Sequence, residues 1–439
     1  MAQDINWKSV GEEAARVLSD YIKIDTTNPP GNEKQAAQFL ADVLKKEGFE
    51  PELLHFNDTR SNLVCRLKGV DSGKPLLLLS HIDVVGAVAK DWKVAPFSGV
   101  IKDGCVWGRG AVDCKGPGVM ELMAFITLKR AGVVPKRDII LLANADEEAW
   151  GDAGARWTVD NHWDKVRCAF VLNEGGMGLS DQFGKRVMMP CFGEKGPLWI
   201  RLRARGKSGH GSMPTPDNPN NKLVAALARV AAYNTRIKLL PEVKDVLLKI
   251  GNNMGFPTSL LVRLAANNFV LNLFGKRLVG TKKLNAIMRN TISITNLKAG
   301  FKENVIPSES EAILDCRLLP GEDETRFIDE LKDVIAMPDV AIEVIRYSAP
   351  SQSPTDNEFM RALERVVAKN NPDALFLPIL SSGFTDSRFF REKGAEAYGL
   401  IPCLFSEEEI GTMHGIDERI SIKCLEDGIR NVFDLCREF

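Results

Sequence analysis

Leu76-Leu-Leu-Leu-Ser-His-Ile-Asp83 is the stretch that decides the fold of this 439-residue chain. Its four leucines form an uninterrupted apolar run, which is typical of a strand buried on both faces of a parallel sheet. The run ends in a His-x-Asp pair, His81 and Asp83. Because α/β enzymes place their chemistry beyond the carboxyl ends of such strands, we expect a functional site here, whereas a lone His-x-Asp pair would more often be a capped surface loop.

Two later segments also place acidic residues in loops that could lie near the end of this strand. The glycine-rich loop Trp107-Gly-Arg-Gly-Ala-Val-Asp-Cys-Lys-Gly116 carries Asp113, and the apolar run Ile139-Ile-Leu-Leu-Ala143 leads into Asp146-Glu-Glu148. Adjacent acids usually form a solvated surface. Here the pair closes an apolar strand, which favours a functional site.

Two more segments complete the pattern. Cys168-Ala-Phe-Val-Leu172 leads into Asn173-Glu174, and Met413-His-Gly415 precedes an amphipathic C-terminal stretch. A parallel sheet brings its strand ends to one rim, so these side chains are expected to converge. Mixed imidazole and carboxylate ligands suit zinc, or less strongly manganese or cobalt. The expected cluster consists of His81, Asp113, Glu147, Glu148, Glu174 and His414.

Helical and strand patterns alternate up to about residue 193, which predicts an α/β domain. Residues 33–47 are expected to form a helix, 62–67 a strand, and 116–130 a helix that begins at the Asp113 loop. Beyond the polar linker 348–354, helix and strand patterns resume. The catalytic domain is therefore expected to be discontinuous, over residues 1–193 and 349–439, with a mixed, mainly parallel sheet.

The pattern changes over residues 194–348, which predict a small inserted α+β domain. Expected strands lie at 197–205, 312–318 and 340–346, and expected helices at 223–233 and 324–335.

A long, mostly helical addition is expected within this domain, at about 239–290. Its segment Leu260–Phe274 is strongly apolar. Such a segment most often packs in a core or a dimer interface, and the alternatives are a cover for an acyl chain or a membrane-surface contact. The sequence leaves these readings open.

Composition limits the classes of partner. Lys plus Arg is 57 and Asp plus Glu is 58, so the net charge is −1. This balance argues against a nucleic-acid partner or an electrostatic contact with a membrane, although it is compatible with local basic clusters. The length predicts two domains.

Cysteine usage and the N-terminal residues indicate a cytoplasmic protein. Nine cysteines are scattered without a Cys-x-x-Cys pair, and several lie in apolar runs. Residues 1–8 lack the features of a secretory signal, and no run reaches the roughly 18 apolar residues that span a bilayer. We expect reduced, mostly buried thiols and no transmembrane segment.

The order of these motifs resembles the M20 family of dizinc amidohydrolases and carboxypeptidases. That family's pattern is His-x-Asp, a Gly-Arg-Gly-x-x-Asp loop, Glu-Glu, a further Glu or Asp, and a late His. The resemblance extends from Ile24-Asp-Thr-Thr-Asn-Pro-Pro-Gly31 to Met413-His-Gly415, nearly the whole chain.

The resemblance implies a role for each residue of the cluster. His81 and Glu174 would bind one metal, Glu148 and His414 the other, and Asp113 would bridge them. Asp83 would orient the His81 ring. Glu147 would be the general base that takes a proton from water and returns it to the leaving amine.

Cys114 departs from the family's pattern, because many members have Asp or Met after the bridging aspartate. The family's geometry also implies a cis peptide between Asp113 and Cys114, which is rare for a bond that does not precede proline.

The resemblance also implies substrate contacts from the inserted domain, which serves the family as a lid and dimerisation domain. His210, in Lys207-Ser-Gly-His-Gly-Ser-Met-Pro214, would stabilise an oxyanion in the partner subunit's site, although such a loop is otherwise a simple turn. Asn304 and Arg317 would hold a substrate carboxylate, although an arginine at a strand end is otherwise solvated. Gly383 and Thr385 would line the specificity pocket.

We therefore expect a cytoplasmic homodimer with two zinc ions per chain, or Co²⁺ or Mn²⁺. It would cleave an amide bond next to a free carboxylate, in an N-acyl amino acid or at the C-terminus of a short peptide. Glu rather than Asp at 174 favours the carboxypeptidases and deacylases over the dipeptidases. The alternatives are a dizinc aminopeptidase, which would leave Arg317 and His210 unused, and a catalytically silent ligand-binding member, whose ligand set would be broken.

Overall fold

The computed structural model describes residues 5–182, 184–267, 270–271 and 282–439. The chain divides into two compact units. Unit 1 comprises Met1–Phe192, Ser353–Ile379 and Thr385–Phe439, and unit 2 comprises Gly193–Gln352 and Leu380–Phe384. Residues 380–384 thus group with unit 2, whereas the sequence patterns assign them to the second part of the catalytic domain.

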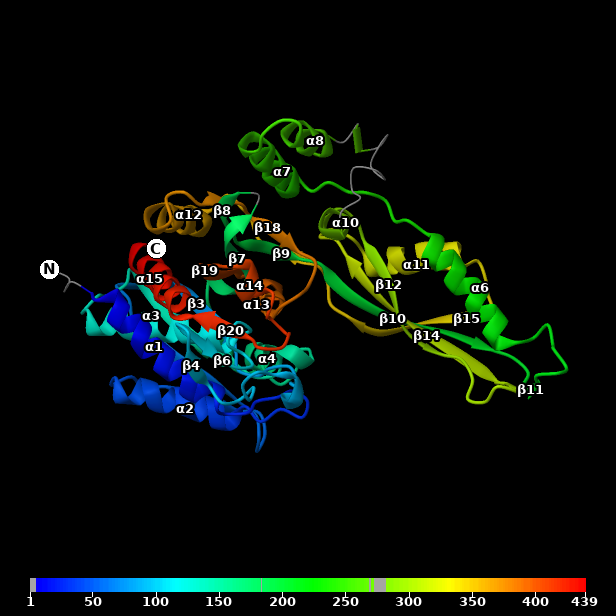
Figure 1. Ribbon diagram of the computed structural model, residues 1–439, viewed down its shortest axis with the longest axis horizontal. Coiled ribbons are helices and arrows are strands. Elements are labelled where there is room, and N and C mark those ends of the chain that lie inside the picture. The colour runs from blue at the N-terminus through cyan, green and yellow to red at the C-terminus, as the bar shows by residue number, and fades with distance from the viewer. Residues whose placement is uncertain (1–4, 183, 268–269, 272–281) are drawn as a thin grey trace. The chain divides into compact units, whose positions relative to one another are not determined.

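Unit 1 is built on a mixed, mainly parallel sheet (Figure 1). Strand β3 lies at its centre and is parallel to its neighbours β6 and β7, while β7 is parallel to β19. Antiparallel β1 and β2 extend the β6 side. This confirms the predicted fold class. Six neighbouring strands of this sheet are, in order, β1 (Glu52–His55), β2 (Ser61–Leu67), β6 (Arg137–Asn144), β3 (Asp71–His81), β7 (Phe170–Gln182) and β19 (Glu396–Phe405).

The leucine run of β3 is buried on both faces, as predicted. Each of Leu76, Leu77, Leu78 and Leu79 is at most 1% exposed. Alternate side chains of a strand point to opposite faces, and Leu77 and Leu79 belong to a core cluster with Val159 and Phe390. Burial of one leucine stabilises the fold by about 2 kcal/mol, so this run anchors the strand that ends at His81.

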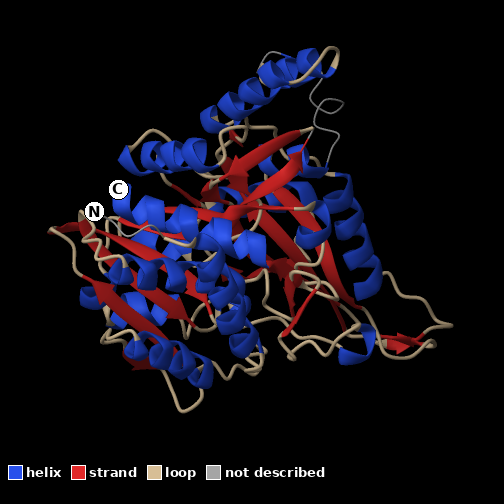
Figure 2. Ribbon diagram, turned by 60° about the vertical axis from the view of Figure 1, so that its left-hand side comes forward, coloured by secondary structure: helices blue, strands red, loops and turns tan. Residues whose placement is uncertain are grey.

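Helices cover the sheet of unit 1, and Figure 2 shows them against the strands from a second side. Helices α1 (Trp7–Ile22), α3 (Lys115–Arg130) and α15 (Ile422–Glu438) pack against one another. Helices α4 (Ala155–Asn161) and α13 (Ser387–Glu392) contribute to the core cluster around Leu77. Helix α2 (Lys34–Lys46) packs against β2. The predicted helices at 33–47 and 116–130 are α2, which is one residue shorter at each end, and α3, which begins one residue earlier.

Unit 2 holds a four-stranded antiparallel sheet in the order β12 (Thr291–Lys298), β14 (Glu309–Leu318), β10 (Gly196–Arg205) and β15 (Val340–Tyr347). Buried and half-buried residues alternate along β14, because one face of the sheet packs on helices. Those helices are α6 (Pro219–Ala232) and α11 (Glu324–Ile335), and the core between them and the sheet includes Leu314 and Phe327. Strand β12 was not predicted.

The helical addition in unit 2 contains α7 (Pro241–Asn253), α8 (Thr258–Ala265) and α10 (Lys282–Met288). Residues 268–269 and 272–274 of the apolar segment lie outside the described residues. Its described part begins on α8, where Leu260 is 50% and Leu261 is 54% exposed. These two leucines therefore lie outside the core of the single chain, and packing in a dimer interface, covering of an acyl chain and contact with a membrane surface stay open predictions for them. No helix in the described ranges combines the length and the apolar character needed to cross a bilayer.

Candidate metal centre

His81 ends β3 and points its ring into a group of carboxylates. The ring is 3% exposed, and its Nδ1 lies 2.9 Å from the main-chain oxygen of Asp83 and 3.6 Å from Oδ1 of that residue. Its Nε2 lies 2.9 Å from Oδ1 of Asp113 and 3.6 Å from Oε1 of Glu174. The main-chain carbonyl of Asp83 is thus nearer to the ring than the carboxylate of the same residue.

Asp113 lies between two imidazoles. Its Oδ1 faces His81, while its Oδ2 lies 3.0 Å from Nε2 of His414. That same Nε2 lies 3.1 Å from Oε1 of Glu148. The carboxylate of Asp113 therefore belongs to two groups of candidate metal ligands at once.

The two groups have the ligand types that were predicted. One contains His81, Asp113, Cys114 and Glu174, the other contains Asp113, Glu148 and His414, and within each group the ligand atoms lie within 4.8 Å of one another. Glu147 belongs to neither group. Five residues predicted as ligands are therefore brought together, with Glu147 beside them.

The loop that carries Asp113 is tightly folded. The Asp113–Cys114 peptide is cis, which confirms the geometry that the resemblance implied. A Cβ atom added to Gly116 would lie 2.0 Å from the main-chain oxygen of Ala111. Only glycine fits at that position, so the motif's last glycine permits the close turn into α3.

A buried carboxylate, Glu418, holds this loop from behind. Its Oε1 accepts hydrogen bonds from the main-chain N–H groups of Val112 (2.8 Å) and Asp113 (3.1 Å). Its Oε2 accepts from the main-chain N–H of Gly110 (3.1 Å) and from Nη1 of Arg109 (2.6 Å). Side chains of Arg109 and Glu418 are 3% and 0% exposed. Such short, charge-assisted bonds fix a backbone strongly.

Arg109 extends this connection to the other histidine. Its Nη2 donates to the main-chain oxygen of Gly415 (2.9 Å) and more weakly to that of His414 (3.3 Å). His414 itself has a positive φ of 57°. The pair of Arg109 and Glu418 therefore joins the Asp113 loop to the His414 loop. Neither residue was predicted to have a role.

The carboxylate of Asp83 fixes the acidic loop after β6. Its two oxygens accept hydrogen bonds from the main-chain N–H groups of Glu147 and Glu148, both at 3.1 Å. Nδ2 of Asn28 donates to the same carboxylate at 2.8 Å. Asp146, the residue before the two glutamates, has a φ of 71°. Asp83 thereby positions both glutamates.

The cluster holds more negative than positive charge. Burial, reinforced by the carboxylate of Glu174, raises the pKa of Glu147 well above its ordinary value. Burial and the nearby Asp113 raise the pKa of Glu174 to about 7. Hydrogen bonds to Asp113 and Glu148 raise the pKa of His414 to about 10. Four carboxylates that share two imidazoles need added positive charge, and two divalent cations would supply it.

Cys114 is the one sulfur in the cluster. Burial, together with the charge of Glu174, raises the pKa of its thiol well above the ordinary value. A neutral thiol is a poor metal ligand, whereas the oxygens and ring nitrogens beside it suit hard or borderline cations. The residues therefore fit two divalent metals with Cys114 as a neighbour.

The residues predicted to bind substrate divide between the units. Thr385 is in unit 1, where its buried Oγ1 accepts a hydrogen bond from Asn173 at 3.1 Å, next to Glu174. His210, Asn304, Arg317 and Gly383 are in unit 2.

Within unit 2, His210 and Asn304 lie at one short two-stranded antiparallel sheet. Strand β11 (Gly209–His210) pairs with β13 (Val305–Ile306), and the main-chain oxygen of Asn304 accepts a bond from the N–H of Gly211 at 2.7 Å. Both side chains are exposed. The Nδ1 of His210 lies 2.7 Å from Oγ of Ser212.

Arg317 is already paired with an acid of its own strand. Its Nε and Nη2 donate to the two carboxylate oxygens of Asp315, at 2.7 and 3.0 Å. The guanidinium also lies over the ring of Phe384, 5.2 Å from its centroid. A substrate carboxylate would therefore have to use the remaining Nη1 edge. Gly383 donates its N–H to Oγ of Ser381 at 3.0 Å.

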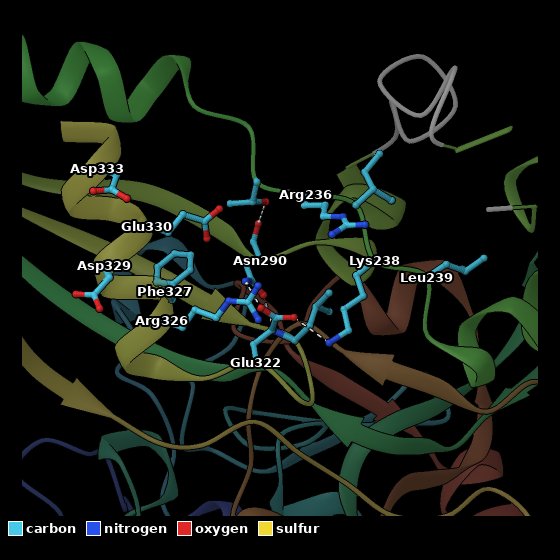
Figure 3. A pocket seen from close by; sticks show the side chains of 13 residues that line it. Arg236, Lys238, Leu239, Asn290, Glu322, Arg326, Phe327, Asp329, Glu330 and Asp333 are labelled. Carbon is cyan, nitrogen blue, oxygen red and sulfur yellow. Dashed lines mark hydrogen bonds and ion pairs between the residues drawn. The ribbon is translucent and has the colours of Figure 1, made fainter. Parts of the chain in front are cut away.

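A cavity of about 900 Å³ in unit 2 lies apart from these residues (Figure 3). Lys238 forms an ion pair with Glu322 there, at 2.8 Å, and Asn290 donates to the same carboxylate. The lining contains no histidine, cysteine or serine. The lining shares no residue with the two ligand groups, so the carboxylate cluster of unit 1 is the candidate site.

Two curated relatives resemble most of the chain. The chain is 30% identical over 381 residues to the N-fatty-acyl-amino acid synthase/hydrolase PM20D1 of Homo sapiens, covering 84% of this chain and 75% of that protein. It is 30% identical over 410 residues to the probable carboxypeptidase S-like 2 of Dictyostelium discoideum, covering 85% of this chain and 77% of that protein.

A solved structure and a family model agree with these relatives. The M20 family metallo-carboxypeptidase Sso-CP2 from Sulfolobus solfataricus shares the fold with a TM-score of 0.76 at 18% identity, over 97% of this chain and 99% of that one. Residues 77–438 match the model described as Peptidase family M20/M25/M40. The chain therefore belongs to this peptidase family and is a metal-dependent hydrolase of carbon–nitrogen bonds.

Proposed function

We propose that the enzyme hydrolyses the amide bond of an N-acyl amino acid or of a short peptide, next to a free carboxylate, with the help of two metal ions. One observation carries the proposal: the two oxygens of Asp113 each face the imidazole of a different ligand group. A carboxylate placed in this way suits a bridge between two cations.

In this proposal His81 and Glu174 hold one ion, Glu148 and His414 hold the other, and Asp113 serves both. Imidazole with carboxylate is a common ligand set for zinc, and it also accepts cobalt or manganese. When bound, the two ions would make a water molecule more acidic and polarise the scissile carbonyl. Two cations would also balance the negative charge of the cluster.

Glu147 moves the proton. Its main chain is fixed by Asp83, and its side chain belongs to neither ligand group. A carboxylate that is held in place without being a ligand can take a proton from the attacking water and give it to the leaving amine. Asp83 positions Glu147 and also orients His81 through its main-chain oxygen.

The substrate class follows from the relatives together with unit 2. One relative is described as an N-fatty-acyl-amino acid synthase/hydrolase and the other as carboxypeptidase S-like. Substrates of both kinds carry a free carboxylate next to the scissile amide. We assign recognition of that carboxylate to Arg317 and Asn304, with Gly383 and Thr385 lining the pocket. No observation favours an aminopeptidase.

His210 is the proposed oxyanion donor, acting in a homodimer from one subunit into its partner's site. Support comes from its exposed position on a short two-stranded sheet of unit 2, where a ring nitrogen bonded to Ser212 fixes the imidazole. A donor placed where negative charge develops lowers the reaction barrier.

We also propose a cytoplasmic location. The described residues form no disulfide bond, and eight of the nine cysteines are buried. Unpaired thiols persist in reducing compartments. Protein purified without reductant and then unfolded should show nine titratable thiols per chain, whereas a lower number would contradict a reducing environment.

Glu147→Gln separates proton transfer from metal binding. This variant should keep its metal content and lose on the order of 10²-fold or more in kcat, because an amide cannot accept the proton. Its matched control is Glu148→Gln, which should lose metal. Metal analysis of dialysed protein alongside steady-state kinetics checks both variants. Metal loss confined to Glu147→Gln would reverse the two assignments.

His210→Ala should lower kcat on the order of 10²-fold with little change in KM, since it removes an oxyanion donor. Mixing inactive His210→Ala chains with inactive Glu147→Gln chains should restore activity, because each hybrid dimer contains one site with both groups intact. Native mass spectrometry verifies the exchange of subunits. Verified hybrids without activity would confine the site to one chain.

Substrates with a free carboxylate should be preferred over their C-terminal amides by on the order of 10²-fold in kcat/KM. Arg317→Ala should abolish most of this preference. Asp315→Asn is the matched variant: because it releases the guanidinium from its internal partner, it should keep the preference. Equal cleavage of acid and amide by the unmodified enzyme would exclude carboxylate recognition and favour an aminopeptidase.

A further inference from the structure

Helices α7 and α8 of unit 2 form a hairpin with an apolar tip. The two helices pack against each other and are joined by a short turn (Figure 1). Phe256, in the turn, is 85% exposed, and Leu260 and Leu261, in the first turn of α8, are 50% and 54% exposed. Three large apolar side chains are thus displayed together at one end of the hairpin, which marks a surface for interaction.

Two cations lie behind this tip. The side chain of Arg263 lies against Gly251 of α7. A Cβ atom built on Gly251 would lie 2.9 Å from Cγ of Arg263. Lys249 precedes Gly251 by two residues, and both charged side chains are exposed. Lys249, near the end of α7, and Arg263, two residues after Leu261 on α8, are therefore the exposed cations nearest in sequence to the apolar tip.

The acidic residues of this helical hairpin lie at the end away from the apolar tip. The two acids of the hairpin, Glu242 and Asp245, lie in the first two turns of α7, at the opposite end from the tip. After Asp245, the sequence contains no Asp or Glu until Glu303, although these residues make up 58 of the 439 in the chain. This separation is local, because the net charge of the whole chain is −1.

We propose that this tip, formed by Phe256, Leu260 and Leu261 with Lys249 and Arg263, docks on an anionic lipid surface. Apolar side chains enter the boundary between head groups and acyl chains, while lysine and arginine just behind them meet the anionic head groups. A nucleic acid would use the cations and leave the apolar tip in water. A protein interface would not need a stretch of sequence without acidic residues around the tip residues.

The test is flotation of the purified full chain with vesicles of phosphatidylcholine alone or with phosphatidylserine added. The protein should float with the anionic vesicles and less with neutral ones, and high salt should weaken the association. Phe256→Ser, Leu260→Ser and Leu261→Ser combined should lower the partition coefficient by at least about tenfold. Lys249→Glu with Arg263→Glu should remove the preference for anionic lipid.

The matched control changes three equally exposed apolar residues of unit 2 outside the hairpin. Val224, Leu297 and Phe301 are 66%, 60% and 83% exposed. Their combined change to serine should leave flotation unchanged. Thermal unfolding and hydrolysis of a water-soluble substrate should be the same in both triple variants, since each change lies on the surface.

Three results would overturn the proposal. The first is protein that stays unbound with both kinds of vesicle, and the second is equal loss of flotation in the hairpin variant and the control. The third is a change from dimer to monomer in the hairpin variant without any flotation of the unmodified chain, which would make the tip a protein interface.

Discussion

The buried carboxylate of Glu418 is the constraint on which the site depends. It accepts three main-chain N–H groups of the Asp113 loop and the guanidinium of Arg109, and Arg109 in turn donates to the loop of His414. A buried ion pair contributes little net stability, but removal of one partner costs about 3–5 kcal/mol because the other charge stays desolvated. The pair therefore fixes one arrangement of the two loops.

A similar constraint holds the four clustered carboxylates in place. Four carboxylates close to one another repel, and an unsupported loop would move apart to relieve the repulsion. Asp83 resists this by binding the main chain of Glu147 and Glu148, while Glu418 resists it at Asp113. Metal ions would then meet a site whose backbone is already fixed, with little reorganisation needed on binding.

Much of the fold and of the site could be predicted from the sequence, because strand ends in a parallel sheet share one rim. The leucine run before His81 gave the central strand, and the spacing of later motifs gave the candidate ligands. Glu418 could not be assigned in this way, since its partners are main-chain groups about 300 residues away. Glu174 lies within β7 rather than at its end, because that strand continues beyond its pairing with β3.

Two other features show what a local sequence pattern can predict and what it cannot. Asp315 and Arg317 are two residues apart on one strand, so their side chains point to the same face of the sheet. This spacing alone could have predicted the ion pair between them. In the hairpin, by contrast, the apolar character of Leu260 and Leu261 was visible but their exposure was not. Exposure depends on which elements pack on α8, and that is a tertiary property.

The central claim is that Asp113 serves two metal ions held by two separate groups. Anomalous diffraction from zinc-loaded crystals, recorded on both sides of the zinc absorption edge, tests it most directly. The account predicts two peaks, one beside His81 and Glu174 and the other beside Glu148 and His414, with Asp113 between them. A single peak, or none at this cluster in zinc-loaded crystals, would contradict it.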